Sequence, residues 1–170
     1  MESTTALLVM DMQAKLLASV PDAQTTIQHM ARAIAYARQQ QIPVIYVVVG
    51  FRDGLPEISS NNKRFSAFRK RLEGMTMQEW MTIHPELAPL ENEPVAVKRR
   101  ISAFAGSDLD ILLRAKQITH LVLGGCSTSG VVLSTLREAA DKDYRLTVLS
   151  DCCMDGDPEV HDLLLRKIFP

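Results

Sequence analysis

Three segments of this chain place residues capable of chemistry directly after apolar runs. Asp11 follows one such run, Lys98 closes a second, and the small-residue turn 125–130 (GCSTSG) follows a third. An aspartate and a lysine that meet in a half-buried cleft form an ion pair, in which the lysine charge favours the carboxylate while desolvation opposes it. A carboxyl group in such a cleft can act as a general acid or base. The first chemical hypothesis is therefore acid–base catalysis by Asp11 beside Lys98.

The turn of small residues lies within the segment Leu121–Thr135, between an apolar strand pattern and the start of an amphipathic helix. Backbone N–H groups at the beginning of such a helix point at whatever lies beyond the strand end. Enzymes use this arrangement to hold a nucleophile and an oxyanion hole together. The first helical turn here offers Val131, which has no reactive group. Gly125 and Gly130 have the spacing of a P-loop, but valines follow them instead of Lys and Ser or Thr, so a nucleotide site is not predicted.

Apolar strand-like runs alternate with helical patterns along the chain. The predicted strands are 6–10, 43–49, 94–98, 120–124 and 144–150, and the predicted helices are 22–41, one beginning near 62, 108–117, 129–141 and 157–168. This alternation predicts an α/β fold in which a three-layer, doubly wound, Rossmann-like parallel sheet of five or six strands is flanked by helices. Ligands bind beyond the carboxyl ends of the strands in such sheets, so Asp11, Lys98 and the turn should meet at one edge.

Length and composition predict a single domain spanning residues 1–170. The chain has 46% hydrophobic and 23% charged residues, which is ordinary for a globular protein. Its formal charge of −1 provides no electrostatic basis for binding nucleic acid or a membrane. Basic residues gather at 63–64 and 69–71, which we interpret as a solvated helix face because no aromatic platform accompanies them.

The cysteines and histidines indicate neither disulfides nor a metal. Cys126, Cys152 and Cys153 form no CxxC pair, and the four histidines lack ligand spacing. We therefore expect no metal and no cofactor. The N-terminus has no basic n-region, and its apolar run is too short for a signal peptide or a membrane span. These features predict a cytoplasmic location.

Four stretches of the sequence resemble the isochorismatase-like hydrolase superfamily. They are LLVMDMQ, VKRRISAFAGSDLD, LVLGGCSTSGVVLSTLREAADKDY and VLSDCC, and the likeness runs from about Ala6 to Phe169. The resemblance implies the isochorismatase-like hydrolase fold, a small-molecule substrate and a homo-oligomer, either a dimer or a tetramer. Relatives usually continue beyond the position of Pro170 into a last short strand, which leaves the expected number of strands at five or six.

In the cysteine-hydrolase branch of this superfamily, an Asp–Lys–Cys triad attacks an amide. The resemblance places the triad Asp at Asp11 and the Lys at Lys98, and the position of the nucleophile is occupied by Val131. It also implies an oxyanion turn shaped by a cis peptide bond between residues 126 and 127. The residues of that turn are Cys126, Ser127, Gly130 and Val131. The metal-binding Asp and His cluster of nicotinamidases has no counterpart in the loop GFRDGLPE, so nicotinamide hydrolysis is not expected.

Three functional hypotheses remain open from the sequence. The first is a hydrolase that uses Asp11 with Lys98 and forms no thioester at position 131, because isochorismatases themselves lack the cysteine and cleave a vinyl ether. The second is an amidase in which Cys126 is a displaced nucleophile. The third is a non-catalytic binding or assembly protein, a pseudoenzyme on the same scaffold, which the loss of the nucleophile would explain.

Residues near the predicted strand ends are candidates for contacts to the substrate. Phe51 and Phe104, with Trp80 as a further aromatic residue, are suited to a flat or apolar ligand. Arg52 is suited to a substrate carboxylate, as are Arg99 and Arg100. The sequence does not identify the substrate itself.

Overall fold

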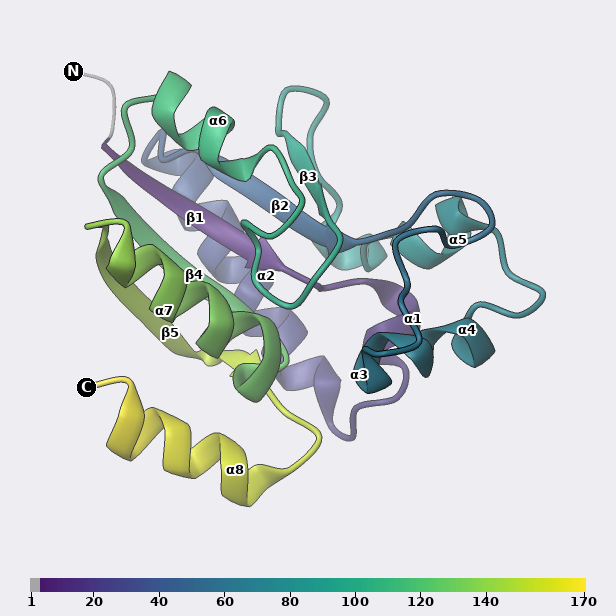
Figure 1. Cartoon of the computed structure of the whole chain (residues 1–170). Helices are drawn as coiled ribbons and strands as arrows, with labels where there is room; N and C mark the ends of the chain where they lie inside the picture. Colours follow the sequence, from purple (N-terminus) through teal and green to yellow (C-terminus); the bar gives the residue numbers. More distant parts are fainter. Residues whose placement is uncertain (1–3) are drawn as a thin grey trace.

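Five parallel strands form one sheet in the computed structural model, which describes residues 4–170 (Figure 1). The strands are β1 (Thr5–Met10), β2 (Val44–Val49), β3 (Val95–Lys98), β4 (His120–Cys126) and β5 (Arg145–Met154). Their order across the sheet is β3-β2-β1-β4-β5, and every adjacent pair is parallel. The predicted α/β fold, with a parallel sheet flanked by helices, is confirmed.

Helices cover the two faces of the sheet unequally. Figure 1 shows α6 and α7 on one face, α2 on the other, and α1 with α3–α5 gathered beyond one end of the sheet. The helices are α1 (Ala14–Leu17), α2 (Ala23–Gln39), α3 (Lys63–Ser66), α4 (Phe68–Arg71), α5 (Met77–Met81), α6 (Leu109–Ala115), α7 (Leu133–Asp141) and α8 (Pro158–Leu163), with short 3-10 or π turns η1 (Pro85–Leu87), η2 (Thr128–Val132) and η3 (Leu164–Ile168). None of the helices formed by residues 4–170 is long and apolar enough to cross a membrane.

Local sequence signals explain where several helices begin. The carboxylate of Asp157 accepts hydrogen bonds from two N–H groups in the first turn of α8, and Pro158 occupies that turn. The side chain of Asn62 caps α3 in the same way. Helix α5, which the hydrophobic pattern did not predict, begins at a capping box formed by Thr76 and Glu79. The capping signal was therefore present in the sequence, although the helix is too short to show a periodicity.

Two predicted elements differ from the structure. The single helix expected from residue 62 is divided into α3 and α4, both of four residues. The fifth strand continues to Met154, so that Cys152 and Cys153 lie within it and not after it. The extension arises because the ends of β4 and β5 resume pairing after an irregularity near Gly125. Both differences affect residues that border the candidate site.

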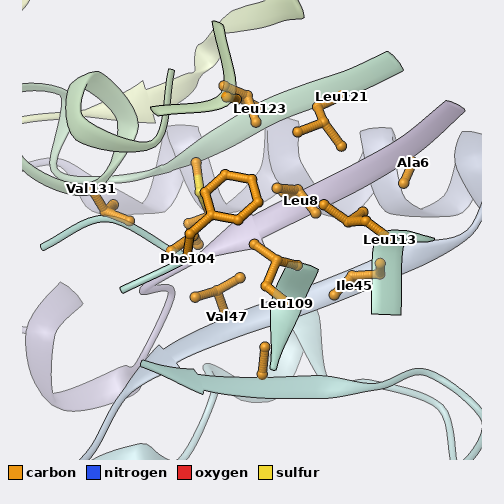
Figure 2. Packing of buried hydrophobic residues seen from close by; sticks show 14 of the residues in the cluster. Ala6, Leu8, Ile45, Val47, Phe104, Leu109, Leu113, Leu121, Leu123 and Val131 are labelled. Atoms are coloured by element: carbon orange, nitrogen blue, oxygen red, sulfur yellow. The ribbon is translucent and has the colours of Figure 1, made fainter. Parts of the chain in front are cut away.

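The hydrophobic core is divided by the sheet. One cluster lies between the sheet and the face covered by α6 and α7, and it includes Leu8, Val47, Phe104 and Val131 (Figure 2). A second cluster lies between the sheet and α2, whose buried residues follow the predicted helical spacing. Strands β1 and β2 are buried on both faces, which explains why their sequences are continuous apolar runs. The rigid sheet thus presents its strand ends as a fixed platform.

Candidate active site

Asp11 and Lys98 form a buried ion pair at the carboxyl ends of the strands. The Nζ atom of Lys98 lies 2.9 Å from Oδ2 of Asp11, and the two side chains are only 3% and 9% exposed. Lys98 ends β3 and Asp11 follows β1, with β2 between them, so the lysine side chain crosses the end of β2. The Asp11 N–H donates to the carbonyl oxygen of Val47 at 2.8 Å, which anchors the residue to β2. The structure therefore brings together the two predicted catalytic residues.

The carboxyl group of Asp11 is held in a strongly desolvated position. Burial raises its pKa above the ordinary value, while the charges of Lys98 and Arg64 act in the opposite direction. Besides contacting Asp11, Nζ of Lys98 donates a hydrogen bond to the carbonyl oxygen of Arg100 at 2.9 Å. The second carboxyl oxygen, Oδ1 of Asp11, is buried and has no hydrogen-bond partner among the described residues. A buried carboxyl oxygen that accepts no hydrogen bond favours the protonated form of the acid.

A cavity of about 380 Å³ opens beside this ion pair, and we call it the strand-end cavity. Its wall includes Asp11, Lys98 and three residues of the turn, namely Cys126, Ser127 and Val131. Strands β1 and β4 are neighbours at the point where the order of strands in the sequence reverses. The cavity therefore occupies the topological switch point, where doubly wound sheets bind their ligands.

The turn after β4 has the geometry that the resemblance implied. The peptide bond between Cys126 and Ser127 is cis. A side chain at Gly125 would collide with the carbonyl oxygen of Met10, so the close approach of β4 to β1 requires glycine there. The turn leads into η2, and Val131 of η2 lines the cavity.

The segment that follows β5 holds this turn through two hydrogen bonds. The N–H of Ser129 donates to Oδ2 of Asp155 at 2.7 Å. The hydroxyl of Thr128, which is fully buried, lies 2.8 Å from Nδ1 of His161 on α8. Both contacts join residues far apart in the sequence, and no motif in the sequence predicted them.

The two residues of the turn that decide the chemistry are Val131 and Cys126. Val131 is 2% exposed, lines the cavity and also packs into the core (Figure 2). The thiol of Cys126 also lines the cavity, but burial raises its pKa to about 12, and the carboxylates of Asp11 and Asp155 act in the same direction. A thiol with such a pKa stays protonated, whereas a nucleophilic cysteine needs a lowered pKa.

Arginines from the two short helices also line the cavity. Arg64 of α3 and Arg71 of α4 are exposed, as predicted for a solvated basic face, yet both contribute to the cavity wall. The guanidinium of Arg71 also lies over the ring of Phe68, 5.9 Å from its centroid. That of Arg64 has no hydrogen bond or ion pair with any residue in the range 4–170. Helical periodicity does not show which side of a short helix faces a cavity, so this role could not be predicted from the sequence.

Three residues proposed for substrate contacts do not line the cavity. Phe51 is buried against Phe65 and other aromatic rings, and Phe104 stacks on Tyr144 in the core at a centroid distance of 6.3 Å. Arg52 instead forms an ion pair with Glu57. Their positions after strands and in a loop were read correctly from the sequence, but packing directs their side chains elsewhere.

The side chains of the remaining candidates donate hydrogen bonds to backbone oxygens at the end of β2 and in the loop that follows it. Arg99 donates to the carbonyl oxygen of Gly50, and Arg100 donates to that of Glu57 at 2.9 Å. The indole N–H of Trp80 donates to the carbonyl oxygen of Val49 at 2.8 Å, and its ring is buried. These side chains satisfy backbone oxygens and so hold the wall of the cavity in place.

Metal binding has no structural support in the part of the chain that the structure describes. Residues 4–170 contain no group of three or more His, Cys, Asp or Glu side chains placed to hold a metal ion. The cavity wall itself carries a desolvated carboxyl group, a buried cation and exposed guanidinium groups.

Comparison with known proteins places the whole described chain in one family of sequences and structures. Residues 5–170 match the isochorismatase domain. The chain is 28% identical over 166 residues to the isochorismatase family protein YwoC of Bacillus subtilis (strain 168), covering 98% of this chain and 86% of that protein. It is 33% identical over 177 residues to the ureidoacrylate amidohydrolase RutB of Pantoea ananatis (strain LMG 20103), covering 91% and 71%. The solved structure of an isochorismatase family protein from Burkholderia thailandensis superposes with a TM-score of 0.85 at 27% identity, covering 98% of this chain and 87% of that one.

Proposed function

The chain belongs to the isochorismatase family of hydrolases, and we propose that it hydrolyses a small, carboxylate-bearing substrate through Asp11 and Lys98 without a thioester at position 131. The observation that carries this proposal is the unpartnered Oδ1 of Asp11, which is buried in a cavity whose wall holds Val131 and no activated nucleophile. Burial raises the pKa of this carboxyl group, which favours the protonated form that a general acid requires.

Covalent amide hydrolysis is less consistent with the site. Several similar proteins are named for amide hydrolysis. In the cysteine-hydrolase branch that the sequence resembles, this reaction uses a nucleophile at the position of Val131. Valine cannot form an acyl intermediate. Cys126 does not replace the missing thiol, because its pKa of about 12 keeps it protonated. We therefore favour a bond whose cleavage begins with proton transfer from an acid, and a vinyl ether is such a bond.

The proposed reaction is the hydrolysis of a vinyl ether to an alcohol and a ketone. Protonated Asp11 donates its proton to the terminal carbon of the double bond, and the ether carbon becomes an oxocarbenium ion. Water adds to that carbon and returns one proton to the carboxylate of Asp11. The resulting hemiketal breaks its bond to the alcohol oxygen, which takes up the hydroxyl proton as the ketone forms. One molecule of water is consumed, and Asp11 ends in its starting state.

Other residues of the cavity would position the substrate for this reaction. Lys98 contacts Oδ2 of Asp11, which leaves the buried Oδ1 as the oxygen that can carry the proton. The guanidinium of Arg64 lies close enough to Asp11 to lower its pKa, so a carboxylate bound to Arg64 would lie near the acid. The apolar wall, which includes Phe65, Phe68 and Ile101, would exclude water from the rest of the substrate.

A substrate panel with two variants tests this function. The purified protein should release a ketone from a vinyl ether such as isochorismate, and Asp11→Asn should slow that release by about 10²–10⁴-fold. Cys126→Ala, a substitution in the same cavity wall, should retain it. Hydrolysis of amides that depends on Cys126 would contradict the proposal in favour of a displaced thiol. If vinyl ethers, amides and esters all remain intact while carboxylates still bind, the chain is a non-catalytic binding protein.

A further inference from the structure

Two hydrogen-bond donors lie close together beside Gly130, and the residues that carry them both line the strand-end cavity. A Cβ atom built on Gly130 would lie 2.6 Å from Oγ of Ser127 and 3.1 Å from Nη2 of Arg64. The hydroxyl and this guanidinium nitrogen are therefore no farther apart than the sum of those two distances. The two side chains pack so closely against residue 130 that a methyl group there would have to displace them. Ser127 comes from the turn after β4, and Arg64 comes from α3.

Neither donor is used within the described part of the protein. Ser127 Oγ and the Arg64 guanidinium make no hydrogen bond or ion pair with any residue from 4 to 170, although both residues line the cavity. A guanidinium carries five N–H donors, and a hydroxyl carries one. Donors of this kind that face a cavity without acceptors are complementary to an anion with two oxygens.

We propose that the Ser127 hydroxyl determines substrate specificity by binding, together with Arg64, one carboxylate group of the substrate. Each donor would contact a different oxygen of a carboxylate bound in the strand-end cavity. The proposal rests on the proposed function for the assumption that the ligand is the substrate. Ser127 would then act through its side chain as well as through the backbone of the turn.

Binding at this place would also affect the catalytic acid. Arg64 is one of the two cations that lower the pKa of Asp11. A carboxylate bound to Arg64 would offset its charge at Asp11 and so raise the pKa of the acid further. The substrate would then help to keep Asp11 protonated while it is bound. An uncharged analogue of the same shape would lack this effect.

The turn contains a matched control for the Ser127 hydroxyl. Ser129 lies two residues further along the same turn, also carries a hydroxyl, and is not part of the cavity wall. Replacing either serine by alanine removes one oxygen from the same turn. Only the loss from Ser127 should affect a ligand in the cavity.

Isothermal titration with pyruvate, and with its uncharged amide as a control, tests the proposal. Pyruvate should bind the unaltered protein more tightly than the amide does. Ser127→Ala should weaken pyruvate binding by about 10-fold or more, as expected for a hydrogen bond to a charged group. Ser127→Thr should restore most of the affinity, and Ser129→Ala should change it by less than about 2-fold, within the usual effect of a neutral surface substitution. Arg64→Gln and Gly130→Ala should both weaken binding, the second because its methyl group would displace the Ser127 hydroxyl and the Arg64 guanidinium. Unchanged melting temperatures would exclude unfolding as the cause.

The outcomes separate this proposal from the proposed function. If Ser127→Ala and Ser129→Ala bind pyruvate equally well, or if pyruvate does not bind the unaltered protein at millimolar concentration, the role of Ser127 is refuted. If pyruvate binds in a manner that depends on Ser127 but no vinyl ether is hydrolysed, the carboxylate site stands and the proposed reaction fails. If vinyl ethers are hydrolysed equally by both serine variants with unchanged KM, the reaction stands and the specificity role fails.

Discussion

The strand-end cavity and a second cavity on the face of the sheet that α2 covers differ in what their walls contain. The second, which we call the helix-side cavity, lies between α2 and the face of β4 and β5, and its volume is about 510 Å³ against about 380 Å³ for the strand-end cavity. Leu7, Ala33, Val122 and Leu149 form much of its wall. By size and apolar character alone, the helix-side cavity would be the stronger candidate for a small-molecule site.

The two cavities also differ in how deeply their charged pairs are buried. In the helix-side cavity, Nδ1 of His29 lies 3.4 Å from Oδ2 of Asp151, and the two side chains are 29% and 62% exposed. The Asp11–Lys98 pair of the strand-end cavity is almost fully buried. Desolvation changes the proton affinity of a carboxyl group, and solvent screening weakens that effect at an exposed pair. Burial of the titratable groups, and not cavity volume, is therefore the feature that identifies the candidate active site.

The largest expected effect is on turnover, and it should distinguish Asp11 in the strand-end cavity from Asp151 in the helix-side cavity. Asp11→Asn keeps the shape of the side chain but removes the transferable proton, so turnover should fall by about 10²–10⁴-fold. Asp151→Asn, the matched change in the helix-side cavity, should leave turnover unchanged. Steady-state assays of both variants on the hydrolysed substrate provide the measurement. Equal losses in the two variants would remove the distinction between the cavities.

The next effect concerns the pH dependence that Lys98 imposes on Asp11. Activity requires the protonated acid, so it should fall as the pH rises through the pKa of Asp11. Lys98 lowers that pKa, and Lys98→Met should therefore move the alkaline limb of the profile to higher pH. A pH–rate profile measures the shift, with exposed Lys116→Met as the control. A limb that stays in place or moves to lower pH would show that Asp11 is not the titrating acid.

A smaller effect is expected where the segment after β5 holds the turn. Asp155→Ala frees the N–H of Ser129, which should loosen the turn and lower kcat by about 10-fold, the effect of losing one charge-assisted hydrogen bond. Asp155→Asn retains an acceptor and should recover part of that loss. Measurement of kcat and of the melting temperature for each variant tests this. An effect on the melting temperature alone would assign Asp155 a purely structural role.

The smallest effect is expected from the thiols, one in each cavity. The pKa values of Cys126 and Cys152 are both raised to about 12, chiefly by burial, so neither thiol is ionised at neutral pH. Cys126→Ala and Cys152→Ala should each change kcat by no more than about 2-fold, as expected when only packing is altered. The two single variants should be assayed in parallel. A selective loss in Cys126→Ala would revive the displaced-thiol mechanism.

Much of the fold and part of the site could be predicted from local sequence patterns. Continuous apolar runs predicted the buried strands, and the residues after them predicted that Asp11, Lys98 and the turn would meet. Helix α5 was not predicted because five residues are too few to show a hydrophobic period, although the sequence contains its capping box. The end of β5 was placed too early because polar residues precede Cys152, whereas pairing with β4 decides where the strand ends.

Residue types and their spacing along the chain were enough to establish the alternation of strands and helices, the reactive residue at each strand end, and the valine at position 131. The packing of distant segments was needed to bring Arg64 close to Ser127 and to turn Phe51 and Phe104 away from the cavity. It also leaves one oxygen of Asp11 without a partner among the described residues. These outcomes depend on desolvation and on the packing of distant segments, neither of which is encoded in any local pattern.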